Sequence, residues 1–253
     1  MSAVGKRSRQ RTPVYGAPAN PILLLPVVGL PEIAPGADLG ELLLEAATRS
    51  GLEFLDDDVL VVTQKIVSKA EGRIQEVHPH DGEARRMIAE MEAARIVRRR
   101  PGLMIAETRH GFVCANAGVD ASNLELGQVT LLPVDPDKSA RRLQRRIRQL
   151  TGRHPAVIIS DTFGRPWRVG QVNMAIGVAG MLPIMDYRGE VDQFGNPLKA
   201  TAIAVADELA SAAELVMGKV DGVPAAVVRG VRFRKGRGKA RALVRSPNED
   251  LFR

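Results

Sequence analysis

Residues 157–165 read VIISDTFGR, an apolar and β-branched run that ends in a carboxylate, a hydroxyl, a glycine and an arginine. An apolar run of this kind suits a strand that is covered on both faces of its sheet. We expect the polar residues that begin at Asp161 to form a turn where this strand leaves the core. The stretch therefore predicts a buried strand with functional groups at its end.

A second polar cluster has the sequence NAGVDASN at residues 116–123. Like the first cluster, it offers an aspartate beside further oxygen ligands and small residues. Oxygen ligands are the ones that Mg²⁺ and Mn²⁺ prefer, so the two clusters together predict a metal-bound phosphate site. Either cluster alone also has the composition of an ordinary turn, because Asp and Asn side chains hydrogen-bond the nearby backbone.

The composition of the 253-residue chain, 45% hydrophobic, predicts a substantial core in one large domain or two interlocked subdomains. The single cysteine, Cys114, excludes an internal disulfide framework and fits a reducing compartment. It lies in an apolar run, so we expect a packed thiol and not a reactive one. Prolines 21, 26 and 31 interrupt the apolar run near the N-terminus, so we expect a cytoplasmic protein without a signal peptide.

The formal charge of +7 is unevenly distributed along the chain. Residues 1–20 carry four positive charges and residues 229–245 carry eight, and neither segment contains an acid. The rest of the chain is therefore net negative. This pattern favours one site for an anionic ligand, or solvated segments, over a surface that binds nucleic acid throughout. We expect residues 1–20 to form a flexible basic tail and residues 21–253 to form a single domain.

Capping signals and apolar periodicity predict helices in four places. The clearest helix covers residues 38–51, where Asp38 and Glu41 have the spacing of a capping box. The other three helices are expected at about residues 83–98, 137–152 and 201–217.

Two of these helices carry more specific expectations. Met87 and Met91 share one face of the second helix, and we expect them to fill the core. The third helix is expected to be capped by Asp137 or Ser139 and to end at Gly152. Its outer face is rich in arginine, which is more typical of a solvated face than of an RNA-binding one.

Further strands are expected at residues 59–62 and 224–228. Strands and helices do not alternate strictly, so the pattern predicts an α+β or mixed α/β fold with mixed sheets and helices.

Several common catalytic motifs are missing from the sequence. It contains no G-x-x-x-x-G-K-[ST] phosphate loop, no G-x-G-x-x-G after a strand and no G-x-S-x-G elbow. Its four histidines, at positions 78, 80, 110 and 154, do not have zinc-ligand spacing. A nucleotide must therefore be bound in another way.

Five motifs occur in a fixed order along the chain: GLPEI at 29–33, VVTQKIVSKAEGR at 61–73, the cluster at 116–123, DTFGRPWR at 161–168 and DYRG at 186–189. On these motifs the chain resembles the coenzyme F420-0:L-glutamate ligase family, in its stand-alone form. The resemblance implies a GTP-dependent amide ligase that adds L-glutamate to F420-0 and then further glutamates through γ-linkages. It also implies a homodimer in which each chain has two interlocked α+β subdomains.

The resemblance also implies roles for individual residues. Asp120 and Asp161 would bind one divalent ion, Mg²⁺ or Mn²⁺, and Thr162 a second one; K⁺ is a further candidate cofactor. Asp161, Arg165 and Lys69 would serve catalysis. The implied GTP contacts are Gly29, Leu30, Pro31, Glu32, Gln64, Lys65, Lys69, Asn123, Met217, Gly218, Asp221 and Gly222.

One departure from the family pattern concerns the second metal ion. Some relatives place an acidic residue after the glycine that ends the fourth helix, whereas this chain has Lys219. The ligands of a second ion are therefore left open. Asp192, Asn173 and Arg188 are further candidates for a substrate groove, and ordinary loop or sheet-edge hydrogen bonding explains them equally well.

The residue types fit acyl-phosphate chemistry. A carboxylate is a poor electrophile, so it would first accept the γ-phosphoryl group of GTP and then react with the glutamate amine. Divalent ions neutralise charge during such a transfer, and Lys69, Arg165 or Arg168 could contact the phosphates.

Two alternative functions remain open on the sequence. A metal-dependent phosphohydrolase would use the same two aspartates with water as the nucleophile. A basic nucleic-acid-binding protein would use residues 232–245, the arginine-rich third helix and the N-terminal tail. Aromatic residues make up 4% of the chain, however, which leaves little surface for base stacking.

Overall fold

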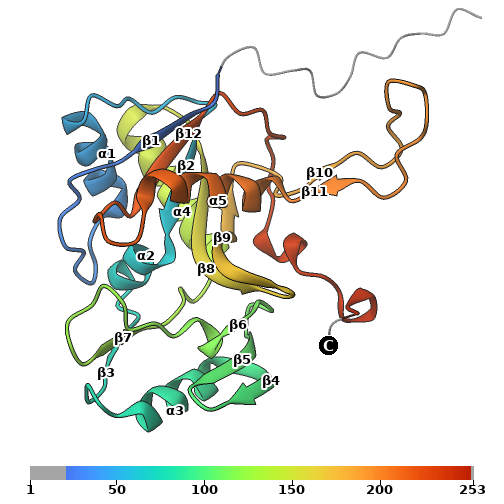
Figure 1. The fold of residues 1–253 in the computed structure, drawn as a ribbon. Helices are drawn as coiled ribbons and strands as arrows, with labels where there is room; N and C mark the ends of the chain where they lie inside the picture. The colour runs from blue at the N-terminus through green and yellow to red at the C-terminus, as the bar shows by residue number, and fades with distance from the viewer. Residues whose placement is uncertain (1–20, 252–253) are drawn as a thin grey trace, which may run out of the picture.

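The computed structural model describes residues 21–251, and the predicted basic tail at residues 1–20 lies outside them. The described part has the predicted α+β fold (Figure 1). A five-stranded mixed sheet with helices on both faces is joined to a smaller group of short strands and one helix.

The central sheet has the strand order β1-β12-β2-β8-β9. Strands β2 (Val59–Thr63) and β8 (Ala156–Arg165) run parallel, and the other neighbours are antiparallel. The apolar residues of β2 and β8 are buried because helices cover both faces, as the sequence predicted. The other strands of this sheet are β1 (Leu23–Pro26), β9 (Arg168–Ala179) and β12 (Ala225–Arg229).

Alternate side chains of β2 enter two separate apolar cores. Leu60 and Val62 pack in the core shared with α1 and α4, whereas Val59 and Val61 pack in the core shared with α5. Figure 1 shows α5 crossing one face of the sheet, with α1 and α4 on the other side. These helices are α1 (Leu39–Arg49), α4 (Pro136–Thr151) and α5 (Val205–Met217).

The chain leaves the central sheet after α2 (Gln64–Ala70) and builds the smaller part before it returns through β7. Small clusters around Met104 and Ala106, and around Ile88 and Leu131, form the core of this part. Its elements are β3 (Ile74–Glu76), α3 (Gly82–Glu92), β4 (Ala93–Arg100), β5 (Leu103–Thr108), β6 (Val113–Ala115), the 3₁₀ turn η1 (Asn116–Gly118) and β7 (Gln128–Thr130). The remaining elements are β10 (Met185–Asp186), β11 (Ala202–Ile203), η2 (Ala240–Leu243) and η3 (Pro247–Glu249).

The polar residues after the apolar run of β8 do not form the predicted turn. Strand β8 continues to Arg165, and β9 pairs with it along its length, with Asp161 opposite Met174 and Thr162 opposite Asn173. The hydrogen bonds to β9 hold this segment extended although its polar composition is typical of a turn.

The predicted helix at residues 83–98 is too long, because α3 ends at Glu92 and the arginine-rich continuation forms β4. Pairing with β5 in a hairpin overrides the helical pattern there. The prediction that Met87 and Met91 fill the core is also wrong, since they are 56% and 59% exposed. Ile88 lies on the buried face of α3 instead.

Helix α4 begins two residues earlier than the predicted Asp137 cap allows and four residues earlier than the predicted Ser139 cap allows. Asp135 is its N-cap and accepts a hydrogen bond from the Lys138 amide at 2.8 Å. Asp137 instead accepts bonds from the amides of Val178 and Ala240, and so ties α4 to β9 and to the C-terminal segment. The predicted end at Gly152 is confirmed, where φ is +73°.

The Asp38 cap of α1 is confirmed, and α5 ends before Gly218 as predicted but begins at Val205 instead of residue 201. Cys114 is buried, which confirms a packed thiol, and burial raises its pKa to about 12. Within residues 21–251, the helices are all too short or too polar to cross a membrane.

A buried ion pair joins Asp58, the residue before β2, to Arg229 at the end of the neighbouring strand β12. Asp58 is fully buried and accepts hydrogen bonds from Arg229 at 2.7 and 2.8 Å and from the Leu55 amide at 2.7 Å. We expect Asp58→Ala to lower the free energy of unfolding by about 3 kcal/mol, because Arg229 would lose its counter-charge. Urea denaturation measures this change.

The neighbouring Asp57 provides a matched control. It is 82% exposed and pairs with Lys235 at the surface, so Asp57→Ala should change stability by less than about 1 kcal/mol. Equal losses in the two variants would contradict the structural role of Asp58.

Candidate functional site

A pocket of about 1100 Å³ lies where β2 passes into α2. The turn after β1, the start of α2, the loop at residues 116–125, the extended part of β8 and the loop after α5 all line it. The pocket therefore lies between the central sheet and the smaller part of the chain, and both polar clusters of the sequence reach it.

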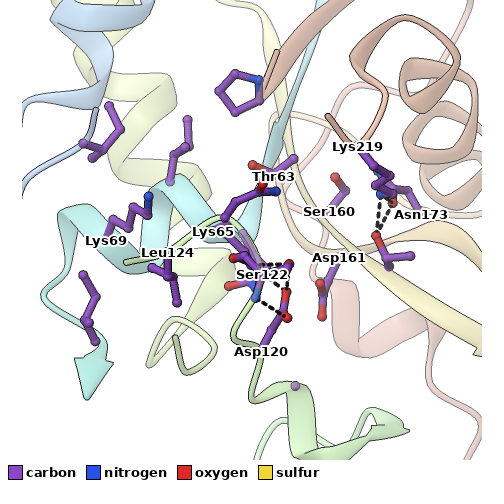
Figure 2. A pocket seen from close by; sticks show the side chains of 18 of the residues that line it. Thr63, Lys65, Lys69, Asp120, Ser122, Leu124, Ser160, Asp161, Asn173 and Lys219 are labelled. Carbon is purple, nitrogen blue, oxygen red and sulfur yellow. Dashed lines mark hydrogen bonds and ion pairs between the residues drawn. The ribbon is translucent and has the colours of Figure 1, made fainter. Parts of the chain in front are cut away.

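The end of β2 explains why β8 offers polar groups to the pocket. Strand β2 stops at Thr63, which is paired with Ser160, so β8 has one unpaired edge from Asp161 onward. Successive side chains of a strand point to opposite faces. Asp161 therefore lies on the side of the 116–125 loop, and Thr162 lies on the side of α5. Figure 2 shows Asp161 between Asp120 on one side and Asn173 with Lys219 on the other.

Asp120 is held by three hydrogen bonds on one side of the pocket. Its carboxylate accepts bonds from Lys65 Nζ at 2.6 Å, from Ser122 Oγ at 2.7 Å and from the Ser122 amide at 2.9 Å. Burial alone would raise the pKa of Asp120, but the bonds from Lys65 and Ser122 outweigh it, so the pKa lies below its usual value. Asp120 is therefore ionised at neutral pH.

Asp161 has the opposite electrostatic balance. Burial raises its pKa to about 6, the charge of Asp120 adds to the rise, and Lys65 and Lys219 offset it only in part. Asp161 therefore lacks compensating positive charge, which a bound cation would supply. The Oγ atom of the adjacent Ser160 is buried without a hydrogen-bond partner.

The donor set fits a hard divalent cation that binds together with phosphate. Among residues 21–251, no group of three or more His, Cys, Asp and Glu side chains could hold a metal ion. Mg²⁺ is commonly bound by one or two carboxylates together with water and substrate phosphates. Asp120 and Asp161 match that pattern, with hydroxyl groups beside them.

Most of the predicted nucleotide contacts line the pocket. Lys69 is buried and its ammonium group pairs with Glu32, and Lys65 pairs with Asp120, so two predicted contacts are oriented by acidic neighbours in the pocket. The predicted site residues that line the pocket are Leu30, Pro31, Glu32, Gln64, Lys65, Lys69, Asp120, Asn123, Asp161, Thr162, Gly218 and Gly222.

Four predicted site residues do not line the pocket. Gly29 accepts a hydrogen bond from Arg49, and Met217 is buried in the core under α5. Asp221 lies beside Gly218 in the loop after α5. Arg165 lies at the turn between β8 and β9, where it donates to the Val169 carbonyl at 2.9 Å.

Two of the three groove candidates make local hydrogen bonds. Arg188 pairs with Asp186, two residues back at the end of β10, and its hydrogen bonds hold the pKa of that carboxyl at about 2. Asp192 accepts bonds from Phe194 and Asn196 within a turn. Their contacts are those of ordinary loop residues. Asn173 differs, because it is buried and lines the pocket.

The structure also reveals a cluster that the sequence did not predict as a unit. Asn173 accepts a bond from Thr162 Oγ1 at 2.8 Å and donates one to Glu214 at 2.7 Å. Lys219 Nζ lies 2.6 Å from Glu214 and donates to Thr162 Oγ1 at 2.8 Å. Glu214 was not among the predicted residues, because an acidic residue within a helix gives no signal of its own. The unpartnered Ser160 was not predicted either.

The local backbone near Asp120 is unusual. Asn116, Ala117 and Asn123 have φ values of +49°, +52° and +52°, in the left-handed region. Non-glycine residues rarely adopt this region, and such conformations cluster at functional sites. The two asparagines of the cluster are the residue type that tolerates it best, which is a signal that the sequence did carry.

Known proteins of one family are similar to this chain over most of its length. The model of the family described as F420-0:Gamma-glutamyl ligase matches residues 28–230. The chain is 44% identical over 249 residues to the coenzyme F420:L-glutamate ligase of Methanothermobacter thermautotrophicus, covering 92% of this chain and 99% of that protein. It is 46% identical over 242 residues to the protein of the same name from Methanopyrus kandleri, covering 88% and 94%.

The raised pKa of Asp161 predicts a pH-dependent change in stability. In the metal-free protein the folded state favours the protonated carboxyl, so ionisation destabilises the fold as pH rises from the usual aspartate pKa of 3.8 through about 6. We expect Asp161→Asn, which stays neutral, to be more stable than the wild type by about 3 kcal/mol above this range. Urea denaturation with a chelator, at about pH 4 and about pH 8, measures the difference.

At the lower pH the difference should shrink to about half a kcal/mol, because Asp161 is then neutral in the folded state and only about half ionised in the unfolded state. Asp57→Asn, at an exposed position, should show no gain at either pH. A wild type that is as stable as Asp161→Asn at the higher pH would contradict the charge deficit at this site.

Proposed function

Because this chain belongs to the F420-0:gamma-glutamyl ligase family, we propose that it is a ligase of coenzyme F420 biosynthesis that joins L-glutamate to F420-0 and then adds γ-linked glutamate. We propose that GTP drives the reaction through an acyl phosphate. The observation that carries this proposal is that the carboxylates of two aspartates and the ammonium groups of three lysines meet in one pocket, which Glu32 and Glu125 also line. These groups belong to Asp120, Asp161, Lys65, Lys69 and Lys219.

The charges of the pocket suit the proposed reactants. GTP, the acceptor carboxylate and glutamate are all anionic, so bringing them together requires positive charge. Lys65 and Lys69 line the wall formed by α2, and Lys219 lies across the pocket from them. Lysine is a common phosphate-binding residue that acts as a point charge.

The proposed reaction has two steps. In the first, the acceptor carboxylate attacks the γ-phosphorus of GTP, the bond to the β-phosphate oxygen breaks, and GDP leaves. In the second, the glutamate amine attacks the acyl carbon, inorganic phosphate leaves with the bonding electrons, and the amine nitrogen loses a proton. The chain's own contribution is to orient the anionic groups and to stabilise the charge that develops.

Asp120 and Asp161 would hold the divalent ion, Mg²⁺ or Mn²⁺. When bound, such an ion neutralises the phosphate oxygens during phosphoryl transfer. Above about pH 6 both aspartates are ionised in the folded chain, so cation binding is favoured at neutral pH. Lys65 pairs with Asp120 in the structure. A cation bound to Asp120 would replace this pairing, and the ammonium group of Lys65 could then turn toward a phosphate group.

We further propose that the chain acts as a homodimer in the cytoplasm. The single buried cysteine suits a reducing compartment. Met87 and Met91 on α3 are exposed apolar side chains beside the edge strand β4, and they offer a surface for a second copy.

Mass spectrometry of the reaction products tests the ligase directly. F420-0 is incubated with the protein, GTP, L-glutamate and Mn²⁺, and each component is omitted in turn. We expect the mass of F420-0 to rise in steps of one glutamyl unit, only when GTP and metal are both present. Release of phosphate from GTP without glutamate, and without an amide product, would instead support a phosphohydrolase.

A substitution of Asp161 tests the metal assignment. We expect Asp161→Asn to lower the rate constant of the ligase by about a hundredfold to a thousandfold, the scale observed when one preorganised electrostatic group is removed. Asp57→Asn serves as the control and should retain wild-type turnover, because Asp57 is exposed and remote from the pocket. Turnover of Asp161→Asn within about tenfold of wild type would contradict the assignment.

A further inference from the structure

Lys219 lies where the resemblance places a second divalent ion. Its Nζ atom is 2.6 Å from Glu214 Oε1, 2.8 Å from Thr162 Oγ1 and 3.3 Å from Asn173 Oδ1. These acceptors are a carboxylate, a hydroxyl and an amide carbonyl, which are also the oxygen types that bind hard cations. An ammonium group has three N–H donors, so three acceptors satisfy it.

The acceptors come from separate elements that hold one another in place. Thr162 is on β8 and its cross-strand partner Asn173 is on β9, while Glu214 projects from α5. Asn173 bonds to both Thr162 and Glu214, and its backbone carbonyl accepts a bond from Ser211 Oγ at 2.7 Å, which ties α5 to β9. The acceptor set is therefore a preformed feature of the fold.

The turn after α5 directs Lys219 back toward the pocket. Gly218 has φ +60° and ψ −169°, a conformation that is essentially limited to glycine. A Cβ atom at this position would lie 2.1 Å from Asp221 Oδ2. The close turn leaves Lys219 beside the end of α5, within reach of Glu214.

We propose that the ammonium group of Lys219 takes the place of the second divalent ion, so that each chain binds one divalent ion, at Asp120 and Asp161, together with one fixed ammonium charge. This inference rests on the proposed function of the same pocket. The residues present do not suit a second divalent ion, because Glu214 is the one carboxylate of the cluster and its other oxygen is engaged by Asn173. Such an ion would also have to displace the ammonium group and then remain close to its positive charge.

The stoichiometry of Mn²⁺ binding tests the proposal without relying on turnover. The full chain is equilibrated with Mn²⁺ and a non-hydrolysable GTP analogue, and bound Mn²⁺ is counted by electron paramagnetic resonance. We expect one Mn²⁺ per chain for the wild type. We expect two for Lys219→Gln, which removes the charge and adds a carbonyl oxygen. The dissociation constant of Mn²⁺ at the second site should be lower in this variant than in the wild type by about tenfold or more.

Two further variants control this result. Lys219→Arg keeps the positive charge and should still bind one Mn²⁺, which separates the charge from the shape of the side chain. Lys138→Gln, an exposed lysine on α4 remote from the pocket, should match the wild type. Thermal unfolding of each variant confirms that it is folded.

The Mn²⁺ counts distinguish a failure of the Lys219 proposal from a failure of the proposed metal site at Asp120 and Asp161. Two Mn²⁺ ions on the wild type, unchanged in Lys219→Gln, would overturn the role of Lys219 and leave the ligase proposal standing. No Mn²⁺ on the wild type, with the analogue present, would overturn the metal site of the proposed function and this inference with it.

Discussion

The pairing of β8 with β9 beyond the end of β2 is the constraint on which the candidate site depends. Strand β2 leaves the sheet at Thr63, yet β9 keeps β8 extended to Arg165. One edge of β8 is therefore unpaired in this region, and its alternating side chains face two different groups of residues. Asp161 faces the cluster around Asp120, and Thr162 faces α5. Had the polar residues formed a turn, they could not have served both sides of the pocket.

The charges of the pocket are balanced differently on the two sides of β8. On the Asp120 side, two carboxylates lie near Lys65, and burial together with the charge of Asp120 raises the pKa of Asp161 in spite of that lysine. On the α5 side, Glu214 faces Lys219 at 2.6 Å, so that charge is already neutralised. Strand β8 thus separates the Asp120 side, where the charges favour a bound cation, from the α5 side, where the ammonium group of Lys219 is itself the cation.

Local sequence signals were sufficient where the chain's own neighbours decide the outcome. The Asp38 cap, the Gly152 and Gly218 helix ends and the apolar strands could all be predicted, because capping and burial depend on short spacing. The predictions failed where distant segments intervene. Pairing with β5 turned the end of the second predicted helix into β4. The sequence also does not reveal which apolar face of α3 turns inward, and Met87 and Met91 lie on the exposed one.

For the site, the sequence by itself determined the kinds of chemical group available: aspartates beside hydroxyl groups, lysines, and asparagines that tolerate left-handed backbone. Five ordered motifs also identified the family, because their residues and order are specific. Only the tertiary structure decided which groups meet. Asp120 and Lys65 are 55 residues apart, and Thr162 and Lys219 are 57 residues apart, yet each pair is in hydrogen-bond contact. The parallel β2–β8 pair, the β8–β9 ladder and the turn at Gly218 place these groups together, and such long-range pairing leaves no periodic trace in the sequence.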